Sequence, residues 1–320
     1  MRAIVITKPG GPEVLSLVER PLPEPSRGEV RVRVRATAVN RADLLQRMGH
    51  YPAPADAPPD IPGLEIAGEV DALGPGVERL KLGDRVFGLV GGGGYAEAIT
   101  SHERALATIP ATMSFEDAAA VPEAFITAHD AIVTQCGLRS GETLLISAAG
   151  SGVGTAAIQL GRAMGATVVG TARTQDKLER ARPLGLDLGV VPVDGRFADR
   201  VPRAHVILEL VGGAYLNEDL QALAPLGRIA LVGLLAGRKT ELDLGAVLAK
   251  RARIFGTVLR ARPLEEKIAA VRAFETQVVP LLERGVIKPI VDRVLPLSDA
   301  ARAHEHMASN EGFGKIVLSV

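Results

Sequence analysis

A glycine-rich run at residues 148–154 has the residue types and spacing to hold a phosphate group. An apolar stretch at 143–147, typical of a buried strand, precedes it, and a helical pattern at 155–160 follows it. The backbone N–H groups of such a turn are open to a phosphate, and the dipole of the helix adds partial positive charge. The turn therefore predicts a dinucleotide-binding site, with contacts expected at Gly150, Ser151, Gly152 and Val153.

A purely structural turn is the alternative for this run, because glycine-rich turns are common and the spacing departs from the usual G-x-G-x-x-G pattern. The neighbouring elements favour binding. A second apolar stretch at 166–170 completes the strand–turn–helix–strand order of a nucleotide-binding unit, so Gly170 and Thr171 are also expected to border the dinucleotide.

The end of that second strand indicates which dinucleotide fits. An NAD site usually has a carboxylate there, about 20 residues past the glycines, that holds the ribose 2′-hydroxyl. Residues 170–174 contain no acid, and Arg173 and Lys177 lie where a 2′-phosphate would be bound. The two basic residues favour NADPH over NADH, although both are also ordinary residues for an exposed helix start and Asp176 weakens their charge.

The composition excludes several classes of protein. The 320 residues include 37 basic and 37 acidic side chains, so no charge excess attracts nucleic acid. The single cysteine, Cys136, excludes an intrachain disulfide and indicates a reducing compartment. The longest uncharged apolar stretch, around 229–237, is too short for a membrane span, and the N-terminus lacks a signal-peptide core. We therefore expect a soluble cytoplasmic protein with no nucleic-acid or membrane partner.

The first third of the chain has the pattern of short β-strands joined by turns. Val30, Val32 and Val34 alternate with arginines, which is typical of a strand with one buried face. Five prolines between residues 52 and 62 predict a loop, because proline disfavours both helix and central strand.

Strands and helices alternate from residue 143 to 259 with short links, which predicts a parallel, doubly wound sheet of the Rossmann type. After residue 264 a long helix precedes short β-elements like those at the start of the chain. The expected fold is α/β, with a Rossmann dinucleotide-binding domain at 123–263 inserted into a mainly β catalytic domain at 1–122 and 264–320.

Together these pieces resemble the medium-chain dehydrogenase/reductase superfamily, whose β domain is GroES-like. They are most similar to the zinc-independent quinone oxidoreductases of the zeta-crystallin type. Residues 40–46, Tyr51 and Ser151 are closest to the p53-inducible quinone oxidoreductase branch. The motifs that carry the resemblance lie at 8–13, 40–44, 62–65, 83–86, 122–124, 127–128, 150–159 and 314–318.

The resemblance implies that the protein binds no metal. Zinc alcohol dehydrogenases of the superfamily have a cysteine at the position of Asn40 and a histidine at the position of Leu64, and neither residue here replaces those ligands. The structural zinc lobe needs four cysteines. His304 and His306 are two residues apart, so on a helix they point to different faces.

Without a Lewis acid, acceptors that take electrons readily fit better than alcohols, namely quinones or carbonyl-conjugated C=C bonds. Tyr51 and Ser151 are the candidate hydrogen-bond donors to the developing oxyanion, and Asn40 would orient the nicotinamide or the substrate. Each residue has an alternative without a catalytic role. Tyr51 would be an exposed aromatic residue of a loop, Ser151 a residue that the turn merely tolerates, and Asn40 the N-cap of a helix.

The resemblance implies further cofactor contacts beyond those of the glycine-rich turn. At the position of Pro192, relatives often have a tyrosine that packs near the adenosine phosphate, so this chain differs from them there. Arg260 and Arg262 follow the last sheet strand and would guide a quinone to the site, although a solvated edge is the better interpretation. A homodimer is expected through the edge strand at 254–259, because pairing hides open edge hydrogen bonds. The further cofactor contacts are Thr127, Gly233, Leu234, Leu235, Thr257, Val258, Leu259 and Lys315.

The leading functional hypothesis is an NADPH-dependent, zinc-independent quinone reductase. An NADPH-dependent enone or alkenal reductase is the nearest alternative. A cofactor-binding scaffold or an RNA-binding crystallin-like protein is the alternative from a different class, and the balanced charge and the lack of a basic aromatic patch argue against RNA.

Overall fold

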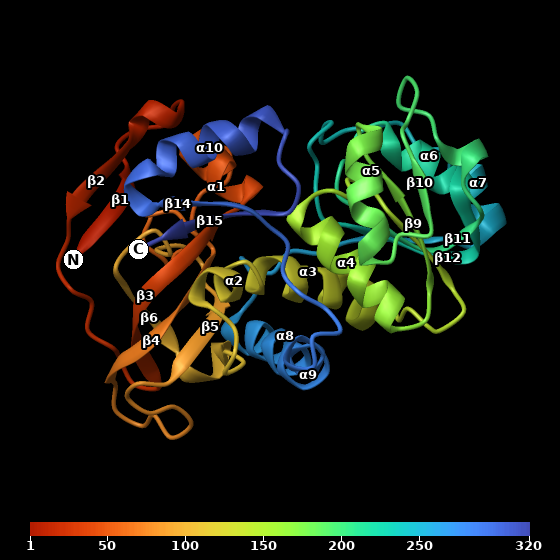
Figure 1. Cartoon of the computed structure of the whole chain (residues 1–320). Coiled ribbons are helices and arrows are strands. Elements are labelled where there is room, and N and C mark those ends of the chain that lie inside the picture. Colours follow the sequence, from red (N-terminus) through yellow and green to blue (C-terminus); the bar gives the residue numbers. More distant parts are fainter. The chain divides into compact units, whose positions relative to one another are not determined.

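A computed structural model describes residues 1–320 of the chain, which form two compact units (Figure 1). Unit 1 comprises residues 1–126, 259–285 and 289–320, and unit 2 comprises 127–258 and 286–288. The sequence placed the boundaries at 122/123 and 263/264. In the structure the chain passes from one compact unit to the other at 126/127 and at 258/259. A helical segment at 122–135, wound largely as π-helix, contains the first of these boundaries. None of the helices has the length and apolar character needed to cross a bilayer.

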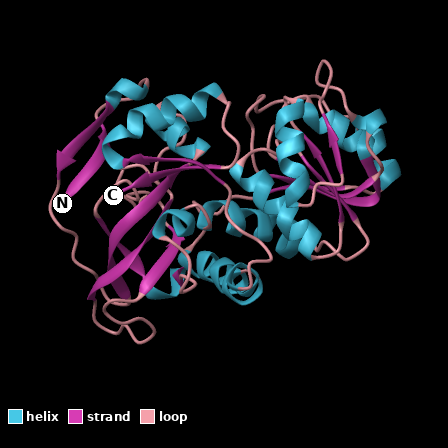
Figure 2. Ribbon diagram, viewed as in Figure 1, coloured by secondary structure: helices cyan, strands magenta, loops and turns pink.

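Unit 1 is built on a seven-stranded sheet in the order β14-β15-β3-β4-β5-β7, with β6 paired to β3, and on a separate hairpin of β1 and β2 (Figure 2). The tail of the chain therefore returns to the sheet of the first third, as the sequence predicts. The strands are β1 (Arg2–Ile6), β2 (Leu15–Glu19), β3 (Glu29–Val39), β4 (Glu65–Leu73), β5 (Arg85–Leu89), β6 (Ala98–His102), β7 (Leu106–Thr108), β14 (Val291–Pro296) and β15 (Lys315–Ser319). The helices are α1 (Arg41–Arg47), α2 (Phe115–Ala119), α8 (Leu264–Gln277), α9 (Val279–Glu283) and α10 (Ala300–Ser309), with shorter helical segments η1 (Pro12–Val14), η2 (Glu103–Ala105), η3 (Pro122–Ile126) and η7 (Leu297–Asp299).

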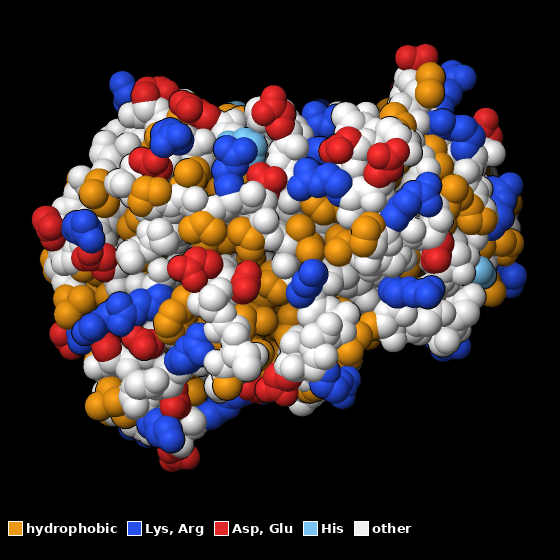
Figure 3. Space-filling view, viewed as in Figure 1, with side chains coloured by type: hydrophobic (Ala, Val, Ile, Leu, Met, Phe, Trp, Pro, Cys, Tyr) orange, Lys and Arg blue, Asp and Glu red, His pale blue; other side chains and the backbone are white.

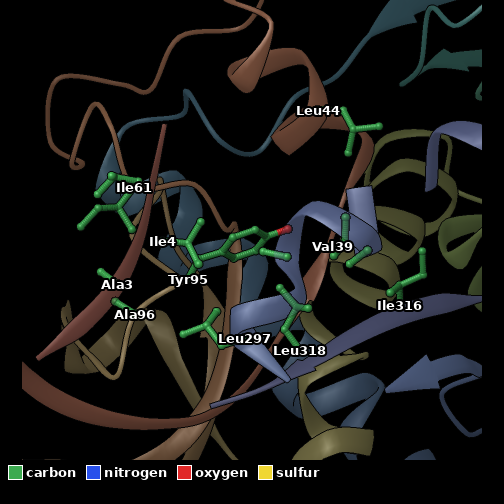
Figure 4. Packing of buried hydrophobic residues seen from close by; sticks show 13 residues of the cluster. Ala3, Ile4, Val39, Leu44, Ile61, Tyr95, Ala96, Leu297, Ile316 and Leu318 are labelled. Carbon is green, nitrogen blue, oxygen red and sulfur yellow. The ribbon is translucent and has the colours of Figure 1, made fainter. Parts of the chain in front are cut away.

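Strand β3 organises the core of unit 1. Val30, Val32 and Val34 are buried in one hydrophobic cluster, so the predicted alternation along this strand is confirmed. A second cluster packs β1, α1 and α10 around Tyr95, whose ring is fully buried among residues such as Ile4 (Figure 4). Burial of these apolar surfaces is the main stabilising contribution to the unit.

Unit 2 has a six-stranded, wholly parallel sheet in the order β10-β9-β8-β11-β12-β13. Numbered along the unit this is the order 3-2-1-4-5-6, so the predicted Rossmann fold is confirmed. The strands are β8 (Thr143–Ile146), β9 (Thr167–Thr171), β10 (Leu188–Val190), β11 (Ala204–Glu209), β12 (Leu223–Leu231) and β13 (Arg253–Gly256). The helices are α3 (Thr127–His129), α4 (Gly152–Ala163), α5 (Gln175–Ala181), α6 (Tyr215–Ala222) and α7 (Leu244–Lys250), with shorter segments η4 (Asp130–Gln135), η5 (Arg182–Leu184) and η6 (Ala198–Arg200).

Side chains alternate across the sheet of unit 2, and both faces are covered. Leu145, Ile207 and Ile229 pack in one cluster with residues of α6 and α7, whereas Leu144 lies against Gly161 of α4. Strand β13 ends at Gly256, so the predicted strand at 254–259 is wrong in its last three residues, 257–259. Figure 3 shows basic and acidic side chains interspersed on the visible face, in line with the equal numbers of both in the sequence.

Candidate functional site

The glycine-rich turn of unit 2 joins β8 to α4 at the carboxyl edge of the parallel sheet. Ala148 has a φ of 49°, in the left-handed region, which turns the chain sharply after the strand. The Ala149 N–H donates to the Thr171 carbonyl 2.8 Å away, so the turn is fastened to the end of β9. The start of α4 therefore lies beside the ends of two strands, which is the usual phosphate position in this fold.

Ser151 is the N-cap residue of α4. Its Oγ accepts a hydrogen bond from the Gly154 N–H at 3.0 Å, which satisfies a backbone donor that the helix leaves open. The hydroxyl proton of Ser151 is still available to a ligand. A Cβ on Gly154 would lie 2.5 Å from the Ala148 carbonyl oxygen, so only glycine permits this close approach of turn and helix.

The other predicted contacts of unit 2 differ widely in exposure. Arg173 is exposed after β9, and Lys177 is partly buried on α5. Thr171 is buried, and its Oγ1 has no hydrogen-bond partner. Thr257 Oγ1 donates to Asp130 Oδ2 at 3.1 Å. Of the remaining predicted contacts, Thr127, Gly150 and Gly170 are buried, Gly152, Val153 and Gly233 are partly buried, and Leu234, Leu235 and Val258 are exposed.

In unit 1, Asn40, Glu65 and Lys315 form a buried polar cluster. Lys315 Nζ lies 2.6 Å from Glu65 Oε1 and also donates to the Asn40 side-chain oxygen and the Val39 carbonyl. Asn40 Nδ2 donates to the same Glu65 oxygen at 2.8 Å. All three side chains are at least nine-tenths buried, so the charges of Glu65 and Lys315 neutralise each other away from water.

Lys315 was predicted to contact the cofactor, but its ammonium group has three donors and the structure supplies three acceptor oxygens for them inside unit 1. Asn40 is the N-cap residue of α1, as one alternative held. Its side chain nevertheless points to Glu65, and Asp43 caps in return by accepting the Asn40 N–H at 2.8 Å.

A second buried chain of hydrogen bonds supports α1. Arg47 can only donate, so His304 Nδ1 accepts from it and the neutral ring carries its proton on Nε2. That Nε2–H donates to the Tyr95 hydroxyl at 3.1 Å, and the hydroxyl donates to Asp43 at 3.3 Å. Burial lowers the pKa of His304 to about 3, which keeps the ring neutral, and raises the pKa of Asp43 to about 6.

Tyr51 begins the proline-rich loop and is partly buried, so it is not simply an exposed aromatic. The Arg260 guanidinium lies 5.0 Å from the centre of its ring and donates to its carbonyl oxygen. Burial raises the pKa of the Tyr51 phenol, while the Arg260 charge opposes that rise. Arg260 is itself buried, so its interpretation as a solvated edge residue is wrong.

Glu123, at the start of the helical segment, completes this group. Its N–H donates to Glu65 Oε2 at 2.7 Å, and burial together with the Glu65 carboxylate raises the pKa of Glu123 to about 8. Its carboxyl group is therefore protonated at neutral pH. With Leu259, Arg260 and Lys267 it lines a cavity of about 20 Å³, which is room for a single water molecule.

Sequence reasoning gave no role to Glu65, Asp43 or Glu123, and it placed Arg260 in solvent. The available signal was weak but present: Glu65 and Glu123 both lie in motifs that are otherwise apolar. An acidic residue in an apolar segment is uncommon without a partner.

No group of three or more His, Cys, Asp and Glu side chains in the structure is arranged to hold a metal ion. Leu64 is buried and apolar, and burial raises the pKa of the Cys136 thiol to about 12, far from the thiolate that zinc requires. His304 is bound within its own chain of hydrogen bonds, and His306 contacts Asp292 at 2.7 Å.

Comparisons with known proteins agree with this architecture. Residues 26–111 match the family model of the alcohol dehydrogenase GroES-like domain, and residues 152–276 match that of zinc-binding dehydrogenase. The quinone oxidoreductase of Rattus norvegicus is 33% identical over 99% of this chain and 97% of its own length.

Solved structures are also similar over the whole chain, two of them as follows. Quinone oxidoreductase of Escherichia coli, complexed with NADPH, has a TM-score of 0.86 and is 29% identical, with 100% of both chains covered. A structure described as an NAD-dependent alcohol dehydrogenase has a TM-score of 0.87 and is 35% identical, again with 100% of both chains covered.

Proposed function

Since the chain belongs to the medium-chain dehydrogenase/reductase superfamily, as a member of its quinone oxidoreductase family, we propose that this oxidoreductase reduces quinones with NADPH and without zinc. The observation that carries the proposal is the Asn40–Glu65–Lys315 cluster. In this cluster the Lys315 ammonium group forms an ion pair with the Glu65 carboxylate, which would otherwise be available to a metal cation.

The donor set of this cluster does not suit zinc. Asn40 supplies an amide, Leu64 supplies no donor atom, and the one carboxylate is already neutralised by Lys315. No Lewis acid would then stabilise an alkoxide, which disfavours alcohol oxidation. A quinone needs no such help, because its reduction yields a stabilised aromatic product.

The residues of unit 2 fit a dinucleotide. The open N-terminus of α4 and the free hydroxyl proton of Ser151 suit a pyrophosphate. The exposed Arg173 guanidinium and the neighbouring Lys177 would hold the 2′-phosphate. NADPH supplies the reducing equivalents when bound.

The residues of unit 1 provide the acceptor chemistry. The Tyr51 phenol is protonated at neutral pH, as any tyrosine is, and burial raises its pKa further; it therefore donates a hydrogen bond to the acceptor oxygen. Asn40 holds its side chain in a fixed direction through Glu65 and Lys315. The Glu123 carboxyl group is protonated at neutral pH and lines the water-sized cavity, so it is a further proton donor in unit 1.

A substrate panel tests the proposal. We expect the purified protein to oxidise NADPH with ortho- and para-quinones, with a higher kcat/KM than with any alkenal or enone. Faster turnover of alkenals would identify a C=C reductase on the same scaffold. Tight NADPH binding without turnover of any acceptor would indicate a scaffold and would contradict an enzymatic role.

We also propose a homodimer formed through β13. This strand lies at the edge of its sheet, and Leu244 and Leu248 of the neighbouring α7 are 68% and 77% exposed. Analytical ultracentrifugation should show a dimer that Phe255→Lys converts to a monomer, while Leu82→Lys, at an exposed position of unit 1, leaves it intact. A monomeric wild type would exclude the dimer.

A further inference from the structure

A single buried arginine fastens the proline-rich loop that carries Tyr51. Arg260 is 8% exposed, and its guanidinium donates to three segments of unit 1. Nε donates to the Gly91 carbonyl at 2.7 Å, one terminal nitrogen donates to the Tyr51 carbonyl at 3.3 Å, and the other donates to Gln46 Oε1 at the end of α1. The loop, the glycine turn and the helix therefore meet on one side chain.

The glycine turn at 91–94 packs directly against the proline-rich loop at 52–62. A Cβ on Gly91 would lie 3.1 Å from both Pro54 and Ala57, so the loop rests almost directly on the backbone of the turn. Arg260 bonds to the carbonyl of that same glycine. The loop and the glycine turn are thus held together by close packing and by the Arg260 guanidinium. A further contact to the loop joins Lys267 Nζ to Asp56 Oδ2 at 3.6 Å.

Burying this guanidinium is costly, and packing alone does not require it. Its hydrogen-bond partners are neutral oxygens, and burial lowers the pKa of Arg260 while Asp43, Tyr51 and Glu123 raise it. The planar group also lies over the Tyr51 ring, where a cation is attracted to the π face. A lysine would present one nitrogen in place of the three separate nitrogens with which the planar guanidinium reaches these acceptors.

We propose that Arg260 is a positioning residue for the reduction: it fixes the direction of the Tyr51 phenol and stabilises the negative charge left when that phenol gives up its proton. This inference rests on the proposed function. Reduction of a quinone takes one hydride, which NADPH supplies when bound and is thereby oxidised to NADP⁺, and one proton. Tyr51 gives that proton: its O–H bond breaks, a new O–H bond forms on the anionic acceptor oxygen, and the electron pair of the broken bond stays on the phenolate. Solvent then returns the proton to Tyr51.

The free protein reports both effects without any turnover. The chain has three tyrosines and no tryptophan, so ultraviolet absorbance follows phenol ionisation cleanly, and Tyr51→Phe identifies the Tyr51 step. Because the Arg260 charge lowers the pKa of Tyr51, its removal should raise that pKa. Hydrogen exchange of residues 49–62 reports whether the loop is still held.

Two variants separate charge from geometry. Arg260→Met should raise the Tyr51 pKa, speed exchange across 49–62 and lower kcat about 10- to 100-fold, with little change in the KM for NADPH. This loss is smaller than the roughly 100- to 10,000-fold of a lost general acid, because the Tyr51 phenol itself remains. Arg260→Lys keeps the charge and loses the planar fork. It should therefore leave the Tyr51 pKa close to that of the wild type while exchange in the loop still rises.

The matched control is Arg85→Met. Arg85 also donates to two backbone carbonyls, those of Ala111 and Met113, and lies 4.5 Å from the centre of the Phe115 ring, but it fastens a different loop. It should change neither the Tyr51 pKa nor exchange at 49–62. Unchanged loop exchange and Tyr51 pKa in Arg260→Met, or an equal loss of kcat in Arg85→Met, would overturn the proposal.

Failure of the proposed function gives a different pattern. A wild type that reduces no quinone, with the loop and phenol effects of Arg260→Met still present, would overturn the quinone assignment and support Arg260 as the residue that positions Tyr51. A fully active Tyr51→Phe variant would overturn the role of the phenol, and with it that of Arg260 in the reaction.

Discussion

Lys315 Nζ lies 2.6 Å from Glu65 Oε1, and both side chains are nearly inaccessible to solvent. They come from β15 and from the first residue of β4, which are neighbours of β3 on opposite sides. The cation beside the Glu65 carboxylate in the interior of unit 1 is therefore the Lys315 ammonium group, which belongs to the protein itself. This internal cation is the physical basis of the metal-free site that we propose.

Removing the charge of one partner of this pair should lower the free energy of unfolding far more than removing both charges. Lys315→Met leaves the Glu65 carboxylate buried and unpaired, which should lower the free energy of unfolding by about 3–5 kcal/mol. Lys315→Met combined with Glu65→Gln should recover a large part of that loss. Urea unfolding followed by circular dichroism measures both, with the exposed Lys81→Met as control. Equal destabilisation by the single and double variants would show that the charges do not act as a pair.

The Lys315–Glu65 pair also shows what the sequence could and could not provide. Local patterns predicted the strand and helix around the glycine run, the alternation along β3 and the loop at 52–62, because each depends on residues close together in the chain. Residues 65 and 315 are brought together only by sheet pairing, so neither their spacing nor their types revealed the ion pair. Arg260 was misjudged for the same reason: its partners lie in segments more than 160 residues away.

Element ends were predicted less well than element types. The apolar residues Val258 and Leu259 continue the pattern of a strand, but β13 ends at Gly256 and Val258 is 53% exposed. Tertiary contacts decide such boundaries, and an apolar residue on the surface is not unusual. The p53-inducible branch and the individual site residues stay predictions.

Glu123 should make the protein less stable as pH rises. An isolated glutamate has a pKa near 4.5, whereas the pKa of Glu123 in the fold is about 8, so between these pH values the folded state holds a proton that the unfolded state releases. Stability is lost across that window. Glu123→Gln should therefore raise stability relative to the wild type by about 1–3 kcal/mol at pH 8, with little difference near pH 4.

Thermal unfolding of both proteins at pH 4 and pH 8 measures this effect. Glu116→Gln, at a partly exposed position of α2, is the control and should show no such pH dependence. A constant difference in Tm between Glu123→Gln and wild type at both pH values would contradict a protonated Glu123.

Asp219 on α6 should behave in the same direction in unit 2. It is fully buried, and burial together with the neighbouring Glu209 carboxylate raises its pKa well above the usual value. The unfolded state releases the proton above about pH 4, which costs stability at neutral pH. Asp219→Asn should stabilise the protein by about 1–3 kcal/mol at pH 8 and not at pH 4. The exposed Asp199→Asn is the control, and a destabilised Asp219→Asn at pH 8 would show that the carboxylate form is needed.

Arg173 should determine the choice between the two dinucleotides. Arg173→Ala removes charge-assisted hydrogen bonds to the 2′-phosphate and should weaken NADPH binding by about 1–3 kcal/mol, with NADH binding almost unchanged. Isothermal titration calorimetry with both cofactors measures this, and the exposed Arg182→Ala is the matched control. An equal loss for NADPH and NADH would contradict selection through the 2′-phosphate.

The central claim, a metal-free site that reduces quinones with NADPH, is tested most directly by measuring metal content and activity on the same sample. The purified protein should oxidise NADPH with a quinone at full rate after exhaustive chelation, with substoichiometric zinc by elemental mass spectrometry. One zinc ion per protomer, removed by the chelator together with the activity and restored with it, would contradict the account.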